Sequence, residues 1–179
     1  MNPIAKIDDG NLKMVMTVTC GALAALCVSL GVRFFGHPPG LRVDPLGGLL
    51  GTEVPHFEIS GLDFGEVSPD SMGGDPYILY FTSTDCDACD SAYPILQNAD
   101  SKIPLLIVGI GSRANLRKVI KAHGITAVVG YDSTRAALRS LGIYGVPSAL
   151  FVDEAGIFRQ AATGPENIFR MFSSFNVDK

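Results

Sequence analysis

A stretch without charge near the start of the chain constrains its organisation more than any other feature. The residues from Met14 to Val32 include no Asp, Glu, Lys or Arg. As a helix, at about 1.5 Å per residue, they would span roughly 28 Å, close to the hydrocarbon core of a bilayer. Lys13 and Arg33 flank the stretch, and such cations can reach the two membrane interfaces. We therefore expect residues 14–35 to form a transmembrane anchor that contacts the lipid bilayer.

Two other interpretations of this stretch are a buried helix of a globular domain and a cleaved signal peptide. Buried helices rarely run this far without a charge. The sequence Arg33-Phe34-Phe35 after the stretch lacks the small residues of a signal-peptide cleavage site. These observations favour an uncleaved anchor. Lys and Arg are balanced across it and do not decide its orientation, but a domain outside the cytoplasm would leave residues 1–13 in the cytoplasm.

The remainder of the chain divides into a linker and one domain. Residues 36–55 (GHPPGLRVDPLGGLLGTEVP) are rich in Gly and Pro, which indicates a linker. Over residues 56–179, apolar runs of strand length alternate with amphipathic segments, which predicts an α/β domain with a central mixed β-sheet flanked by helices. The predicted strands are 56–60, 77–83, 104–109, 126–131, 148–153 and 157–162, and the predicted helices are 89–99, 114–123, 133–141 and 165–175. We expect Ser133 to cap the third of these helices.

The composition excludes several classes of protein. The chain has 179 residues with 14 Lys+Arg against 18 Asp+Glu, and no basic stripe that would predict nucleic-acid binding. A hydrophobic fraction of 47% is too high for a disordered chain. The 4 cysteines are too few for a disulfide scaffold.

Two of the cysteines form a Cys-x-x-Cys motif where the predicted strand 77–83 gives way to a helix. Cys86 falls at the helix start, where free N–H groups stabilise a thiolate, and Cys89 lies one turn further on. This placement predicts a redox pair in which Cys86 attacks a disulfide and Cys89 resolves the mixed disulfide. A structural zinc site or two inert thiols are the alternatives. Zinc would need two further ligands at matching spacing, so we expect no metal and no other cofactor.

Three segments resemble the thioredoxin superfamily, and within it the membrane-anchored TlpA/ResA-type (redoxin or MauD-like) thiol–disulfide oxidoreductases. They are GTEVPHFEIS, YILYFTSTDCDACDSAYPIL and GIYGVPSALFVDEAG, within residues 51–175. The resemblance implies a thioredoxin-like fold. It also implies that Pro94 kinks the helix after the motif. It further implies that Val146-Pro147 is a cis-proline pair that faces both cysteines and binds the substrate chain.

The chain departs from this family at several positions around the motif. Asp85 stands where an aromatic residue is usual, and Ala88 where proline is usual. Tyr80 occupies the position of the buried carboxylate of thioredoxin, and Ala92 that of a glutamate in ResA-type proteins. The sequence therefore assigns no side chain as general base for Cys89.

Aspartates surround the motif as Asp-Cys-Asp-Ala-Cys-Asp. Negative charge on Asp85 and Asp87, and on Asp90, disfavours a neighbouring thiolate, and no Lys, Arg or His occurs between Tyr77 and Lys102. We expect these aspartates to tune the redox potential towards the reducing end of the family. Alternatively, Asp85 or Asp87 caps the helix and is held away from the sulfur.

Together these features predict a thiol–disulfide oxidoreductase that reduces or isomerises disulfides of cell-envelope proteins. Such disulfides exist outside the cytoplasm, so we expect a single-pass inner-membrane protein whose domain faces the periplasm or cell exterior. An upstream membrane electron donor or acceptor would recharge the cysteines. One alternative is a peroxiredoxin-like peroxidase, but Leu79 and Ser83 replace the Pro and Thr of its Pro-x-x-x-Thr-x-x-Cys motif. Another is a non-catalytic assembly factor whose cysteines bind copper or a partner.

We predict that the anchor remains attached to the mature protein, because no good cleavage site follows it. N-terminal sequencing of protein purified from membranes should recover residues that precede position 14. A mature N-terminus near residue 36 would instead identify a signal peptide.

Overall fold

The computed structural model of the chain describes residues 46–63, 65–99 and 103–175. The predicted anchor and the residues before it lie outside these ranges. Within them, no helix is both long and apolar enough to cross a membrane.

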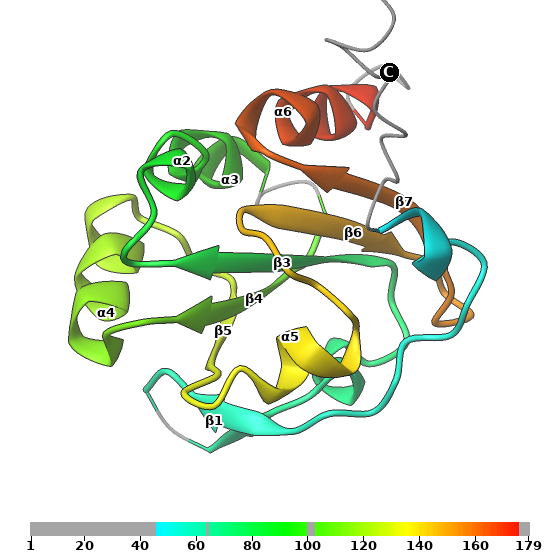
Figure 1. Cartoon of the computed structure of the whole chain (residues 1–179), viewed down its shortest axis with the longest axis horizontal. Coiled ribbons are helices and arrows are strands. Elements are labelled where there is room, and N and C mark those ends of the chain that lie inside the picture. The colour runs from blue at the N-terminus through cyan, green and yellow to red at the C-terminus, as the bar shows by residue number, and fades with distance from the viewer. Residues whose placement is uncertain (1–45, 64, 100–102, 176–179) are drawn as a thin grey trace, which may run out of the picture. The chain divides into compact units, whose positions relative to one another are not determined.

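Seven strands form one mixed sheet in the order β2-β1-β5-β4-β3-β6-β7 (Figure 1). The three central strands, β3, β4 and β5, run parallel to one another, and every other pairing is antiparallel. The predicted mixed sheet is therefore confirmed, whereas the short strand β2 was not predicted. The strands are β1 (Ile59–Gly61), β2 (Glu66–Val67), β3 (Tyr77–Ser83), β4 (Leu105–Ile110), β5 (Val128–Tyr131), β6 (Ser148–Val152) and β7 (Phe158–Thr163).

The helix predicted over residues 89–99 is two helices, and Pro94 does not lie at the break. The first helix ends at Asp90, and the second begins at Tyr93 with Pro94 in its first turn. Proline suits this position because its missing N–H has no partner in the first turn of a helix. The helices are α2 (Asp87–Asp90), α3 (Tyr93–Ala99), α4 (Arg113–Ala122), α5 (Ala136–Ser140) and α6 (Pro165–Ser174), with 3₁₀ turns η1 (Gly47–Leu49) and η2 (Pro69–Met72).

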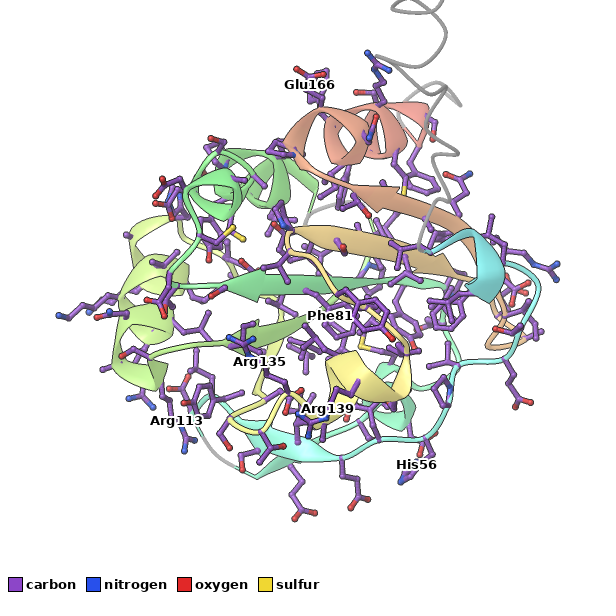
Figure 2. The ribbon with its side chains drawn as sticks, viewed as in Figure 1. His56, Phe81, Arg113, Arg135, Arg139 and Glu166 are labelled. Carbon is purple, nitrogen blue, oxygen red and sulfur yellow. The ribbon has the colours of Figure 1, made fainter. Side chains whose placement is uncertain are left out.

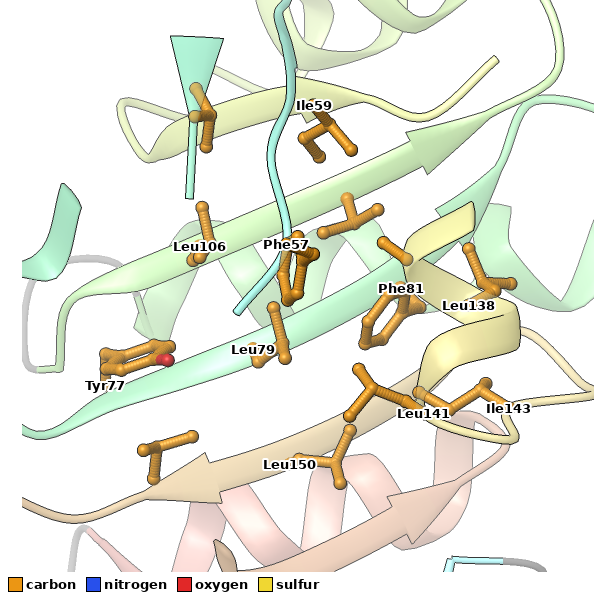
Figure 3. Packing of buried hydrophobic residues seen from close by; sticks show 14 of the residues in the cluster. Phe57, Ile59, Tyr77, Leu79, Phe81, Leu106, Leu138, Leu141, Ile143 and Leu150 are labelled. Atoms are coloured by element: carbon orange, nitrogen blue, oxygen red, sulfur yellow. The ribbon is translucent and has the colours of Figure 1, made fainter. Parts of the chain in front are cut away.

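The sheet separates two apolar cores, and β3 contributes to both. All seven residues of β3 are buried, and they alternate between the two faces of the sheet. Leu79 and Phe81 pack on the face covered by α5, where Figure 3 shows Leu138 and Leu141. Ile78, Tyr80 and their neighbours pack on the other face, against apolar residues of α3, α4 and α6.

The folded domain begins before the predicted boundary at residue 56. Leu46 is buried at 1% exposure, and η1 follows it. Gly51 N–H donates to the Phe158 carbonyl oxygen, and Phe158 N–H donates to Thr52 in return, at 2.8 and 3.0 Å. These bonds attach the end of the predicted linker to β7, so residues 46–55 belong to the domain.

An aspartate fixes the start of α5, where the sequence predicted a Ser133 cap. The carboxylate of Asp132 accepts hydrogen bonds from Ala136 N–H and Ala137 N–H, both at 2.9 Å. Asp132 is only 2% exposed, whereas Ser133 is exposed. The helix begins three residues later than predicted, because the capping group reaches forward from the end of β5.

We predict that Asp132→Ala lowers the free energy of unfolding by about 1–2 kcal/mol, because two helix N–H groups lose their acceptor. Ser133→Ala is the matched control and should leave it within about 0.5 kcal/mol. Urea unfolding of both variants measures the difference, and a larger loss in Ser133→Ala would restore the sequence-based assignment.

Candidate functional site

The two cysteines of the motif lie just after the central strand β3, in different environments. Cys86 is the N-cap of α2, and its sulfur accepts a hydrogen bond from Cys89 N–H at 3.3 Å. Both thiols are free; Cys86 is partly exposed, while Cys89 has 0% exposure. A substrate can therefore reach Cys86 but not Cys89. Among the described residues, no three His, Cys, Asp or Glu side chains gather as a metal site.

The loop before β6 brings the predicted proline pair to Cys86. The Val146–Pro147 peptide bond is cis, as the resemblance implied. The Cys86 thiol donates to the Val146 carbonyl oxygen, with a sulfur–oxygen distance of 3.5 Å. The structure thus unites the cysteine with a dipeptide 60 residues later in the chain.

Burial keeps Cys89 protonated. Loss of solvent and, to a smaller extent, a hydrogen bond with Cys86 raise the pKa of the Cys89 thiol to about 12, against lowering effects of hydrogen bonds with the Ser83 backbone and the Thr82 side chain. Thr82 is itself hydrogen-bonded to the Tyr93 hydroxyl, with an oxygen–oxygen distance of 2.9 Å. The thiol therefore rests against hydroxyl groups.

The two positions where related proteins carry acidic groups are buried and neutral here. Ala92 has 0% exposure, and so has Tyr80, whose hydroxyl makes no hydrogen bond among the described residues. Burial, together with the nearby Cys89, raises the pKa of Tyr80. Thr82 and Tyr93 were not recognised from the sequence, because a Thr or Tyr within an apolar run looks like an ordinary core residue.

The aspartates beside the motif are exposed, and neither Asp85 nor Asp87 caps α2. The cap is Cys86 itself, so the capping alternative is wrong. The Asp85 carboxylate accepts a hydrogen bond from the Thr84 hydroxyl at 3.4 Å. That hydroxyl accepts one from Ser112 N–H at 3.0 Å, which ties the loop before Cys86 to the loop after β4.

The loop after β4 can approach this closely because it contains Gly111. Its φ of +95° lies in the left-handed region that favours glycine. A Cβ atom here would lie 2.4 Å from Thr84 Oγ1 and 3.2 Å from Asp85 Oδ2. A side chain at position 111 would therefore force Thr84 and Asp85, which precede Cys86 in the chain, to shift.

A cleft of about 510 Å³ opens beside Cys86. Cys86 and Asp85 line it, and so do Arg135 and Arg139 from the α5 region. Figure 2 labels the two arginines. Both arginines were missed from the sequence, because they are about 50 positions from the motif along the chain. Since they line the same cleft as Asp85, the charge around Cys86 is mixed.

Comparison with known proteins identifies the family. The AhpC/TSA family profile matches residues 50–161, which include both cysteines and the cis proline. The chain belongs to the AhpC/TSA family. A curated relative is the thiol–disulfide oxidoreductase ResA of Geobacillus thermodenitrificans. It is 25% identical over 150 residues, which cover 79% of this chain and 81% of ResA.

Solved structures confirm the thioredoxin-like fold of this family member. A thiol:disulfide interchange protein DsbE from Chlorobium tepidum aligns with a TM-score of 0.64 at 18% identity, over 71% of this chain and 95% of that one. StoA from Bacillus subtilis aligns with a TM-score of 0.55 at 20% identity, over 67% and 96% of the two chains. These alignments show that the chain has the fold of both proteins.

We predict that limiting iodoacetamide labels Cys86 before Cys89 in the reduced full-length protein. Cys86 is accessible, whereas burial and the raised pKa of about 12 keep Cys89 an unreactive thiol at neutral pH. Peptide mapping measures the labelling, and unfolding in denaturant should abolish the preference. Faster labelling of Cys89 in the folded protein would reverse the assignment of the two cysteines.

Proposed function

We propose that this protein is a membrane-tethered thiol–disulfide oxidoreductase that reduces or isomerises disulfides of cell-envelope proteins through Cys86 and Cys89. The observation that carries the proposal is the contact between the accessible Cys86 thiol and the Val146 carbonyl oxygen, with Cys89 buried one turn behind. The family and the ResA relative support the same chemistry.

The reaction consists of two exchanges. The Cys86 thiolate attacks a substrate disulfide, a bond forms between Cys86 and one substrate sulfur, and the other substrate sulfur leaves and takes up a proton. Cys89 then loses its proton and attacks Cys86 Sγ. The first substrate sulfur leaves and is protonated. The substrate disulfide is reduced to two thiols, which takes up two electrons and two protons. The Cys86 and Cys89 thiols are oxidised to a disulfide in exchange.

The raised pKa of Cys89 separates these two steps in time. As a buried thiol it does not compete with Cys86 for the incoming disulfide. In the mixed disulfide it lies beside Cys86 Sγ, and the leaving substrate sulfur can accept its proton directly or through water. No carboxylate is required at the positions of Tyr80 and Ala92.

The cis-proline loop offers a surface for the substrate chain. Once Cys86 enters a mixed disulfide, its hydrogen bond to Val146 is lost, and the Val146 carbonyl oxygen becomes free to accept a substrate backbone N–H. An extended substrate segment paired in this way would lie along the loop next to Pro147. We propose that Val146 and Pro147 form the substrate-binding surface.

The uncharged stretch from Met14 to Val32, within the anchor expected at residues 14–35, supports membrane tethering, as does the redox chemistry of the domain. Disulfide substrates place the domain in the periplasm or at the cell exterior, with an upstream membrane electron donor or acceptor as its redox partner. Asp85 lies close enough to the cleft to tune the couple, and Arg135 and Arg139 oppose its charge.

The structure gives less support to a peroxidase. Leu79, at the position of the motif's proline, is a fully buried core residue of β3, and Ser83 replaces its threonine. Ser83 Oγ accepts a hydrogen bond from Asp85 N–H at 3.2 Å, so its hydroxyl helps to shape the loop before Cys86.

We predict that the full-length protein in detergent reduces insulin with dithiothreitol, and that Cys86→Ser abolishes this activity. Cys89→Ser should trap substrate on Cys86, visible as a band shift on non-reducing gels that dithiothreitol reverses. Cys20→Ser, outside the motif, is the control and should reduce insulin at the wild-type rate. Turnover of hydrogen peroxide or stoichiometric copper binding, without insulin reduction, would instead support the peroxidase or the assembly factor.

A further inference from the structure

The two arginines in the cleft differ from Arg113, Arg117 and Arg159, whose side chains have partners. Arg113 donates hydrogen bonds to two backbone carbonyls, and Arg117 and Arg159 pair with Asp63 and Asp153. Arg135 and Arg139 are exposed, and neither side chain makes a hydrogen bond or an ion pair within the described segments. Two uncompensated guanidinium groups therefore face the space next to Cys86.

The backbone of Arg135 adopts a strained conformation. Its φ of 58° and ψ of 29° lie in the left-handed region, and among the described residues it is the one non-glycine with a positive φ. Glycine would adopt this conformation without strain. Strained positions of this kind concentrate at functional sites, which suggests that the arginine side chain has a role beyond the fold.

The rest of the cleft suits a polypeptide. Leu138 and Ile143 provide apolar lining, and Tyr144 is 90% exposed at the edge, next to the loop that ends in the cis proline. Exposed tyrosine and arginine around an apolar centre are typical of surfaces that bind protein chains. Because Asp85 also lines the cleft, a substrate carboxylate is favoured beside Arg135 and Arg139 rather than beside Asp85.

We propose that this cleft selects substrates by an acidic segment that flanks their disulfide, with Arg135 and Arg139 pairing its carboxylates. This inference rests on the proposed function, since it names the class of polypeptide that the oxidoreductase reduces. The electrostatic attraction speeds encounter and orients the substrate, so it affects the rate of mixed-disulfide formation more than the chemistry at sulfur.

Three synthetic peptides test the inference. They share one intramolecular disulfide and differ in a flank rich in Asp, Lys or Ser. The reduced full-length protein in uncharged detergent reacts with each, and the second-order rate of peptide dithiol formation is measured at low and high salt. We expect the Asp peptide to react about tenfold faster than the Lys peptide at low salt, and the preference to shrink at high salt.

The arginines are then changed one at a time. Arg135→Gln and Arg139→Gln should each lower the Asp-to-Lys rate ratio about threefold, and the double variant should bring it near one. Arg170→Gln is the matched control, because Arg170 is exposed on α6 and does not line the cleft. It should leave the ratio unchanged. The rate with the Ser peptide reports any change in the reactivity of Cys86 itself, so each rate is divided by the Ser-peptide rate of the same variant.

Arg135→Gly distinguishes an effect of the Arg135 charge on substrate choice from an effect of Arg135 on stability. It should lower the rate ratio as Arg135→Gln does, while its Tm is not lower than that of the wild type, because glycine relieves the left-handed strain. A lower Tm would show that Arg135 has a structural role, and would overturn its part in the inference.

The remaining outcomes distinguish the inference from the proposed function. Reduction of all three peptides at one rate overturns the inference and leaves the oxidoreductase intact. No reduction of any peptide overturns the oxidoreductase itself. If Arg170→Gln lowers the Asp-to-Lys rate ratio as much as the cleft variants do, the preference follows from net charge alone. That result would overturn the inference that the cleft selects acidic substrates. Oxidised glutathione reacting as fast as the Asp peptide would replace the acidic polypeptide with a small acidic disulfide.

Discussion

The pairing of β3 with β6 is the constraint on which the site depends. These strands run antiparallel, with Phe81 opposite Ser148, so the chain that leaves β3 meets the chain that enters β6. Cys86 and Val146 thereby come into hydrogen-bond contact across a long stretch of sequence. A shift of one residue in this register would turn every side chain of β3 to the opposite face and separate the cysteine from the proline loop. The apolar cores on both faces of β3 oppose such a shift.

Unequal burial gives the two cysteines different tasks. They are one helical turn apart, yet one sulfur is partly exposed beside a cleft, and the other is enclosed among core residues and hydroxyl groups. The motif alone does not bury Cys89, because α2 is only one turn long. Cys89 is buried because it packs with Tyr93 and Leu96 of α3 against the sheet. The sulfur of Cys86 also accepts the N–H of Cys89, which couples the environments of the two residues.

Features set by nearby residues could be predicted from the sequence, whereas those set by distant residues could not. The bounds of β3 and the placement of Cys86 follow from a local apolar run and its end. The cis proline followed from a resemblance carried by a short segment. The cap of α5 is a local exception. Asp132 and Ser133 are neighbours and both residue types cap helices, so only the folded backbone shows which side chain reaches the free N–H groups. Arg135 and Arg139 were missed because no local pattern shows that they line the same cleft as Cys86.

Gly111 lies in a loop that contributes no reacting group, yet it constrains the residues that precede Cys86. The space a side chain would need there is already occupied by Thr84 and Asp85. Any larger residue at this position acts on the approach to Cys86 from 25 positions further along the chain. In a library of random variants, changes at Gly111 would therefore group with active-site changes in their effect on function. They would do so although position 111 touches neither sulfur nor substrate, and a map of tolerated substitutions would show a functional site wider than its reacting groups.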